Sequence, residues 1–170
     1  MDFRWQPVVQ RVAGAGLALL PAAPGAASAL ELAAGGRTPY AIVQGAGATE
    51  AERFAACELT NFLFRITGAA FPIVSETNHP AGAPAVYVGP TAFAAALGLD
   101  MAALGPETWV LRTAGDSLVL AGGRPRGTLY AVYEFLETYG GCRWVSHDLD
   151  IVPTQSVFRV PALNEQGEPA

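Results

Sequence analysis

The chain has 170 residues, of which 51% are hydrophobic and 15% charged, so it is large enough for one domain with a substantial apolar core. Its formal net charge is −5, and all ten basic residues are arginine. An acidic chain without basic clusters argues against nucleic acid and anionic lipid as partners, because both are bound by neutralising phosphates with lysine or arginine. A neutral ligand such as a sugar fits this charge better.

The first thirty residues differ in composition from the rest. Arg4 and Arg11 precede an apolar stretch over residues 12–20, and small residues follow as far as Ala29. This order is typical of a secretory signal, so we predict a signal peptide over residues 1–29, cleavage after about Ala29, and a secreted or periplasmic protein. The alternative, a membrane anchor, is disfavoured because the apolar run is too short to span a bilayer. We therefore expect no membrane span after cleavage.

Residues 30–39 are rich in Ala and Gly and are interpreted as a linker, and residues 40–43 as a short strand. Thr49 and Glu52 have the spacing of a capping box, and Gly68 is a natural helix stop, so a helix is expected over about residues 50–67.

The expected helix carries a continuous apolar stripe suited to packing on a sheet, formed by Ala51, Ala55, Leu59, Phe62 and Ile66. Three further apolar side chains, Phe54, Cys57 and Phe64, lie off this stripe. They indicate either a helix buried on two sides or an uncovered patch, and we expect them to form a surface facing a partner.

Strands are expected over residues 71–74 and 85–88, and a short helix over residues 91–97. The runs 108–113 and 117–120 flank an Ala-Gly-Asp turn and predict an antiparallel hairpin.

The last expected helix begins near Pro125 and ends at Gly140, and a strand follows over residues 142–145. The resulting order, β-α-β-β-(α)-β-β-α-β, predicts an α+β fold with a mixed sheet and two main helices on one face. The domain is expected over residues 40–153, with residues 154–170 as an extended tail or a linker toward a catalytic domain.

The segment 122–128 (GGRPRGT) places a glycine loop between a strand and a helix, an arrangement that can cradle phosphate. A phosphate loop of this length needs lysine after its last glycine, where Thr128 stands. Arg124 and Arg126 could still hold a carboxylate or a sulfate, but a plain strand-to-helix turn is favoured.

Other chemistry has less support. His79 and His147 are far apart, and His147 with Asp148 and Asp150 fits a solvated turn better than a cation site. Glu134 and Glu137 are neighbours on one helical face, which favours surface charges over a catalytic pair. We therefore predict no catalytic residue, metal ligand or cofactor in these 170 residues.

The two cysteines, Cys57 and Cys142, could form a disulfide in an exported protein. Their spacing fits no metal or redox motif, so two small buried apolar residues are an equally good interpretation. The sequence leaves both open.

The segment 126–136 (RGTLYAVYEFL), followed by 141–144 (GCRW) and by Val152-Pro153, resembles the N-terminal domain of α-glucuronidase-like and β-N-acetylhexosaminidase-like glycoside hydrolases. Shorter pieces at 41–43, 55–59, 66–68, 72–74, 86–89 and 118–122 agree in order, so the resemblance covers about residues 40–153. It implies a hexosaminidase N-terminal-domain-like α+β domain, zincin-like in topology without the zinc site, that precedes a catalytic (β/α)8 barrel carrying the catalytic residues.

Three functions are compatible with these patterns. The first is the non-catalytic accessory domain of a secreted enzyme that degrades polysaccharide or glycan, with glycoside hydrolase activity only when joined to the barrel. The second is a stand-alone carbohydrate-binding module, which requires Tyr130 and Trp144 to be exposed and co-planar. The third is an anion-binding protein, which requires Arg124 and Arg126 to converge, with Arg143 as a third cation.

Overall fold

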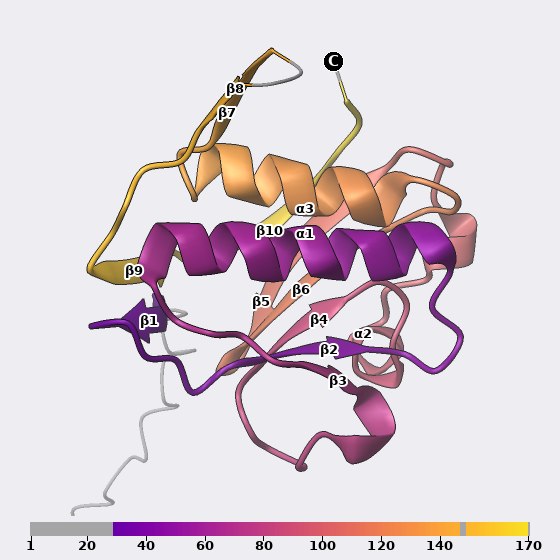
Figure 1. The fold of residues 1–170 in the computed structure, drawn as a ribbon. Helices are drawn as coiled ribbons and strands as arrows, with labels where there is room; N and C mark the ends of the chain where they lie inside the picture. The colour runs from indigo at the N-terminus through magenta and orange to yellow at the C-terminus, as the bar shows by residue number, and fades with distance from the viewer. Residues whose placement is uncertain (1–28, 147–148, 170) are drawn as a thin grey trace, which may run out of the picture.

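The computed structural model describes residues 29–146 and 149–169, and its central feature is a six-stranded mixed sheet (Figure 1). The strand order is β10-β5-β6-β4-β2-β3. The strands are β2 (Ala41–Gln44), β3 (Ile73–Ser75), β4 (Ala85–Val88), β5 (Trp109–Ala114), β6 (Ser117–Gly122) and β10 (Asn164–Gly167). Neighbours among β3, β2, β4 and β6 are parallel, whereas β5 is antiparallel to both β6 and β10. The predicted α+β class and mixed sheet are thus confirmed.

The two central strands, β4 and β6, are buried along their whole length. Their sequences, AVYV and SLVLAG, are nearly continuous apolar runs. Such runs are expected where both faces of a sheet are covered, and this sheet has a separate apolar cluster on each face.

Helices α1 (Glu50–Thr67) and α3 (Gly127–Thr138) lie side by side over one face (Figure 1). The start of α1 follows its sequence signals, because Thr49 accepts a hydrogen bond from the Glu52 amide and the Glu52 carboxylate accepts one from the Thr49 amide. Gly68 ends the helix in the left-handed conformation, with φ 72°. The predicted bounds of α1 are confirmed, and most of its predicted apolar stripe lies in the core.

The opposite face is covered by the short helix α2 (Ala92–Ala96) and the single turn η2 (Met101–Ala103), and a second single turn, η1 (Glu76–Asn78), follows β3. Two carboxylate oxygens of Glu76 accept hydrogen bonds from the first amides of α2, those of Ala92 and Phe93. The ring of Phe93 stacks on Tyr87 of β4, with centroids 4.2 Å apart. The two main helices thus share one face, as predicted, and the short helix lies on the other.

The interpretation of residues 30–39 as a linker and of 154–170 as a tail is wrong in part. Strand β1 (Leu30–Ala34) pairs antiparallel with β9 (Val157–Val160), and β10 forms an edge of the main sheet. Composition concealed these strands, because β1 lies among small residues and β10 is polar. Burial explains why β1 pairs with β9, since the inward side chains of both strands join the main core. The predicted signal segment 1–29 lies almost wholly outside the described residues.

Strands β7 (Arg143–Ser146) and β8 (Leu149–Ile151) form a separate antiparallel hairpin beyond the end of α3. The first of these strands was predicted and the second was not. No helix in the described part of the chain is long and apolar enough to cross a membrane.

Candidate interaction surface

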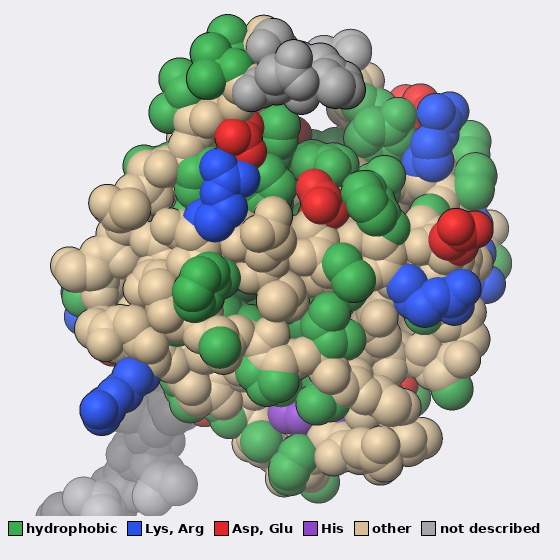
Figure 2. Space-filling view, viewed as in Figure 1, with side chains coloured by type: hydrophobic (Ala, Val, Ile, Leu, Met, Phe, Trp, Pro, Cys, Tyr) green, Lys and Arg blue, Asp and Glu red, His purple; other side chains and the backbone are tan. Residues whose placement is uncertain are grey.

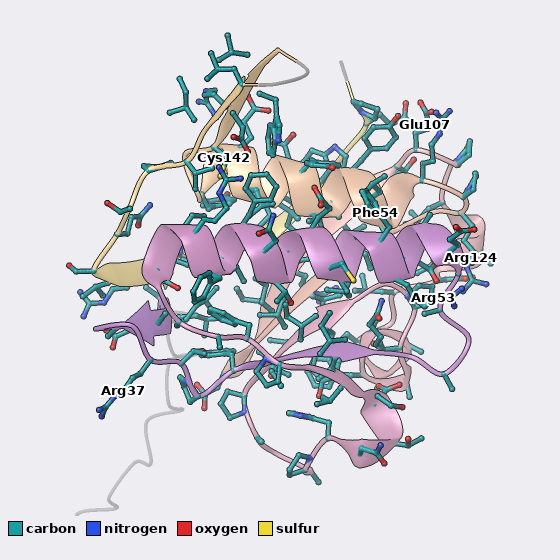
Figure 3. All side chains as sticks on the ribbon, viewed as in Figure 1. Arg37, Arg53, Phe54, Glu107, Arg124 and Cys142 are labelled. Atoms are coloured by element: carbon teal, nitrogen blue, oxygen red, sulfur yellow. The ribbon has the colours of Figure 1, made fainter. Side chains whose placement is uncertain are left out.

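Arg124, which lies near the start of α1 (Figure 3), is bound to a buried carboxylate rather than free to hold a ligand. Its Nε and Nη2 donate to the two carboxylate oxygens of Glu52, at 2.9 and 3.1 Å, and Nη2 also donates to the Gly47 carbonyl at 2.9 Å. Glu52 is only 1% exposed. Its hydrogen bonds to the guanidinium raise the pKa of Arg124 further above its usual range. The pair therefore joins the start of α1 to the loop before α3.

Arg126 points to a different partner. Its Nη2 lies 2.5 Å from Oε1 of Glu107, and the Arg126 side chain is 59% exposed. The backbone amides of Arg126 and Gly127 both donate to the Pro106 carbonyl at 3.1 Å. The two guanidiniums are thus each held by a separate carboxylate, and the amides of Arg126 and Gly127 are already occupied. The structure does not bring Arg124 and Arg126 together, which the alternative of an anion site required.

The glycines of the 122–128 segment allow its backbone to pack closely against the backbone of the 105–108 loop. A Cβ on Gly123 would lie 1.9 Å from the Gly105 carbonyl oxygen, and one on Gly122 would lie 2.4 Å from both the Thr108 oxygen and the Gly127 carbonyl carbon. Only glycine allows the end of β6, the start of α3 and the 105–108 loop to meet at this distance. The segment is a tightly packed strand-to-helix turn, the interpretation that the missing lysine favoured.

The other residues that the sequence analysis weighed as catalytic or metal-binding groups also make contacts within the domain. Glu134 accepts a hydrogen bond from Thr138, and Glu137 lies 3.4 Å from Nη1 of Arg143. His79 contacts the Ala83 carbonyl at 3.1 Å. Within residues 29–146 and 149–169 there is no group of three His, Cys, Asp or Glu that could hold a metal ion, and His147 and Asp148 lie outside the described residues.

One face of the β7–β8 hairpin is anchored to the helices. Trp144 contacts Phe62 of α1 and Tyr133 of α3 edge-on, with ring centroids 5.5 and 5.0 Å apart. Arg65 places its guanidinium carbon 4.9 Å from the centre of the Phe62 ring and donates to both carboxylate oxygens of Asp150, at 2.5 and 3.0 Å. This forked hydrogen bond lowers the pKa of Asp150.

The opposite face of the hairpin is largely apolar and is not covered by any other described residue. Side chains alternate along a strand, so Val145, Leu149 and Ile151 lie on the face away from Trp144 and Asp150, together with Arg143, the register partner of Ile151. The three aliphatic side chains are 58%, 53% and 53% exposed. Figure 2 shows hydrophobic side chains gathered over this hairpin.

The predicted partner-facing residues of α1 are exposed, as expected. Phe54 and Phe64 are 51% and 54% exposed, and Cys57 is also exposed. They do not form one patch, because Phe54 lies on the side toward α3 (Figure 3), whereas Phe64 lines a shallow hollow with Phe71 and Pro72 next to β3.

The aromatic pair required for a carbohydrate platform is not formed by the predicted residues. Trp144 is 39% exposed and is engaged by Phe62 and Tyr133. Tyr130 is half-buried, and among the described side chains it makes no ring contact with Trp144. Cys57 and Cys142 are both free thiols, the first exposed and the second buried.

A cavity of about 460 Å³ lies at the carboxyl ends of β4 and β6. Its walls come mainly from apolar residues of α2 and η2, and Arg124 stands at its edge. Because the guanidinium already binds Glu52, this cavity presents no convergent set of free polar groups.

Sequence reasoning missed several residues that organise this surface. Glu52 was expected only as part of a helix cap, and the hydrogen bond from Tyr133 to Glu58, at 3.0 Å, was not expected. The three exposed aliphatic residues of the hairpin were also missed. Their sequence signal was the placement of valine before, and of leucine and isoleucine after, the pair His147-Asp148.

Fold and surface together define a small α+β domain whose arginines tie its elements together and whose helical side carries an uncovered apolar hairpin. Residues 35–135 match the model of the glycosyl hydrolase family 67 N-terminus. This match spans more than half of the chain, so the chain belongs to that family. The resemblance stated from the sequence motifs is thereby confirmed.

Among solved structures, the chain is similar to a family GH115 4-O-methyl-α-glucuronidase, BtGH115A, described as specific for decorated arabinogalactans. The TM-score is 0.53 at 19% identity, over 84% of this chain and 18% of that protein, so the chain corresponds to less than a fifth of its length. This likeness concerns the fold alone.

A mutant β-hexosaminidase of Streptomyces plicatus, in complex with its product GlcNAc, is a weaker match, with a TM-score of 0.35 at 15% identity over 68% of this chain and 20% of that protein. No curated protein sequence matches the chain.

Proposed function

We propose that this chain is the non-catalytic N-terminal accessory domain of a secreted, α-glucuronidase-like glycoside hydrolase that acts on polysaccharide or glycan. In this proposal it supports a catalytic (β/α)8 barrel in the same or a neighbouring polypeptide. The observation that carries the proposal is the match of residues 35–135 to the N-terminus of a glycosyl hydrolase family.

The ion pairs within the domain support a structural role for its charged residues. Five arginines form ion pairs with carboxylates that lie far away in sequence or on another element, and these pairs join separate parts of the fold. Glu52, the most buried of these carboxylates, is fully engaged by Arg124 and by the Thr49 amide. A general acid or nucleophile needs a carboxyl that faces substrate, and Glu52 is buried away from solvent.

The proposal is tested by assaying a panel of aryl glycosides that includes a glucuronide and an N-acetylglucosaminide. The 170-residue chain is compared with the longer protein encoded when the genomic reading frame is extended downstream. We expect hydrolysis only by the extended protein. Turnover by the purified 170-residue chain alone would exclude a purely accessory role.

A further inference from the structure

The β7–β8 hairpin is held to the domain by one of its faces only. Trp144 and Asp150 make the contacts to α1 and α3 described above. Among the strands of the described residues, β7 and β8 pair only with each other. A two-stranded hairpin is marginally stable by itself in water. Its free face carries three aliphatic side chains that are each more than half exposed. An exposed cluster of this composition is typical of a strand surface that is buried in a contact with another domain or protein.

Asp150 and Arg143, the charged side chains that the structure describes on this hairpin, are already paired within the domain. Asp150 is bound by Arg65, and Arg143 donates to the Glu137 and Cys142 carbonyls and faces the Glu137 carboxylate. A partner therefore needs no opposite charge at the rim, because the rim offers balanced pairs around an apolar centre. This is the pattern of an apolar interface core with a polar edge.

The position of the C-terminal strand indicates which partner fits. Strand β10 is the last element of the domain, and Figure 1 shows the chain leaving it beyond α3, on the side of α3 to which the hairpin also projects. The related glucuronidase is more than five times as long as the segment it shares with this chain. Polypeptide that continues from β10 would therefore begin on the side of α3 from which the hairpin projects.

We infer that Val145, Leu149 and Ile151, on the free face of the β7–β8 hairpin, form the surface against which the catalytic domain of the same enzyme packs. This inference rests on the proposed function. The hairpin then lies between the two domains. Trp144 and Asp150 fix its inner face to α1 and α3, and its outer face is buried only in the complete enzyme.

The test is thiol accessibility at the centre of this face. Leu149→Cys is made in a Cys57→Ser background, which removes the exposed native thiol and leaves the buried Cys142. A maleimide should label Cys at 149 rapidly in the 170-residue chain and at least about tenfold more slowly in the extended enzyme. Ala81→Cys, in an exposed loop between β3 and β4, is the matched control and should react equally fast in both.

Val145→Cys provides a second reporter if the first variant melts at a lower temperature than the background chain. Equal labelling of position 149 in both proteins, with the extended protein active on glycosides, overturns this inference and leaves the proposed function standing. An extended protein inactive on every glycoside overturns the proposed function itself. Slow labelling in the short chain that depends on its concentration would assign the face to a second copy and would also overturn the inference.

Discussion

At the residue scale, the ion pair of Glu52 and Arg124 joins a buried carboxylate to a half-exposed guanidinium. Glu52 is 1% exposed, whereas the side chain of Arg124 is 50% exposed. Arg124→Met would leave a carboxylate buried without its cation, which we expect to reduce the free energy of unfolding by about 3 kcal/mol. Glu52→Gln should cost less, because its amide oxygen can still accept from the Thr49 amide. Urea unfolding followed by circular dichroism measures both.

The double variant is the control for this prediction. If the uncompensated carboxylate causes the loss, Glu52→Gln combined with Arg124→Met should be more stable than Arg124→Met alone. Additive losses would show that the two side chains act independently.

Tyr133 gives a prediction for alkaline pH. Burial and the hydrogen bond to Glu58 raise its pKa to about 12. A raised pKa stabilises the folded state below the ordinary tyrosine pKa near 10, and this contribution disappears as pH rises from about 10 to 12. Tyr133→Phe should therefore lose less stability over that interval than the parent chain, as measured by melting temperature. An identical decline in the melting temperature of the variant and the parent chain would assign the loss of stability to other groups, among them Tyr139, whose pKa is also about 12.

At the element scale, the turn between β6 and α3 depends on its lack of side chains. Gly123→Ala should destabilise the domain by about 3 kcal/mol, because its Cβ would overlap the Gly105 carbonyl. Gly47→Ala is the matched control, since a Cβ there meets nothing within 4 Å. Thermal melts of the two variants are compared. Equal stability of both would contradict the packing role assigned to this turn.

The hairpin gives the second prediction at this scale. The pKa of Asp150 is lowered chiefly by its hydrogen bonds to Arg65, so the pair stabilises the hairpin above the ordinary aspartate pKa and loses this effect as pH falls through the lowered value. In a Trp109→Phe background that lacks residues 1–29, and with them Trp5, fluorescence reports on Trp144. Its emission should shift to the red in strong acid, and Asp150→Asn should show part of that shift at neutral pH. Emission that is the same in both chains at all pH values would contradict the anchor.

At the scale of the whole molecule, the sequence predicted the elements that carry strong local signals. The capping box and Gly68 defined α1, and the Ala-Gly-Asp turn defined the β5–β6 hairpin. Strands β1, β9 and β10 were missed because their pairing joins chain segments far apart in sequence, and polar β10 shows no apolar alternation. The partners of Arg124 and Arg126 were equally unpredictable, since those contacts depend on how helices and loops meet.

The central claim is that this domain supports a catalytic domain, and the most direct measurement is rescue in trans. The catalytic portion of the extended enzyme is expressed without the first 170 residues, and its hydrolysis of a preferred aryl glycoside is measured while the 170-residue chain is added. We predict that kcat/KM or thermal stability rises to a saturating level, and that Leu149→Glu raises the concentration of chain required at least about tenfold. A catalytic portion that is fully active and stable alone, and unchanged by the added chain, would contradict the account.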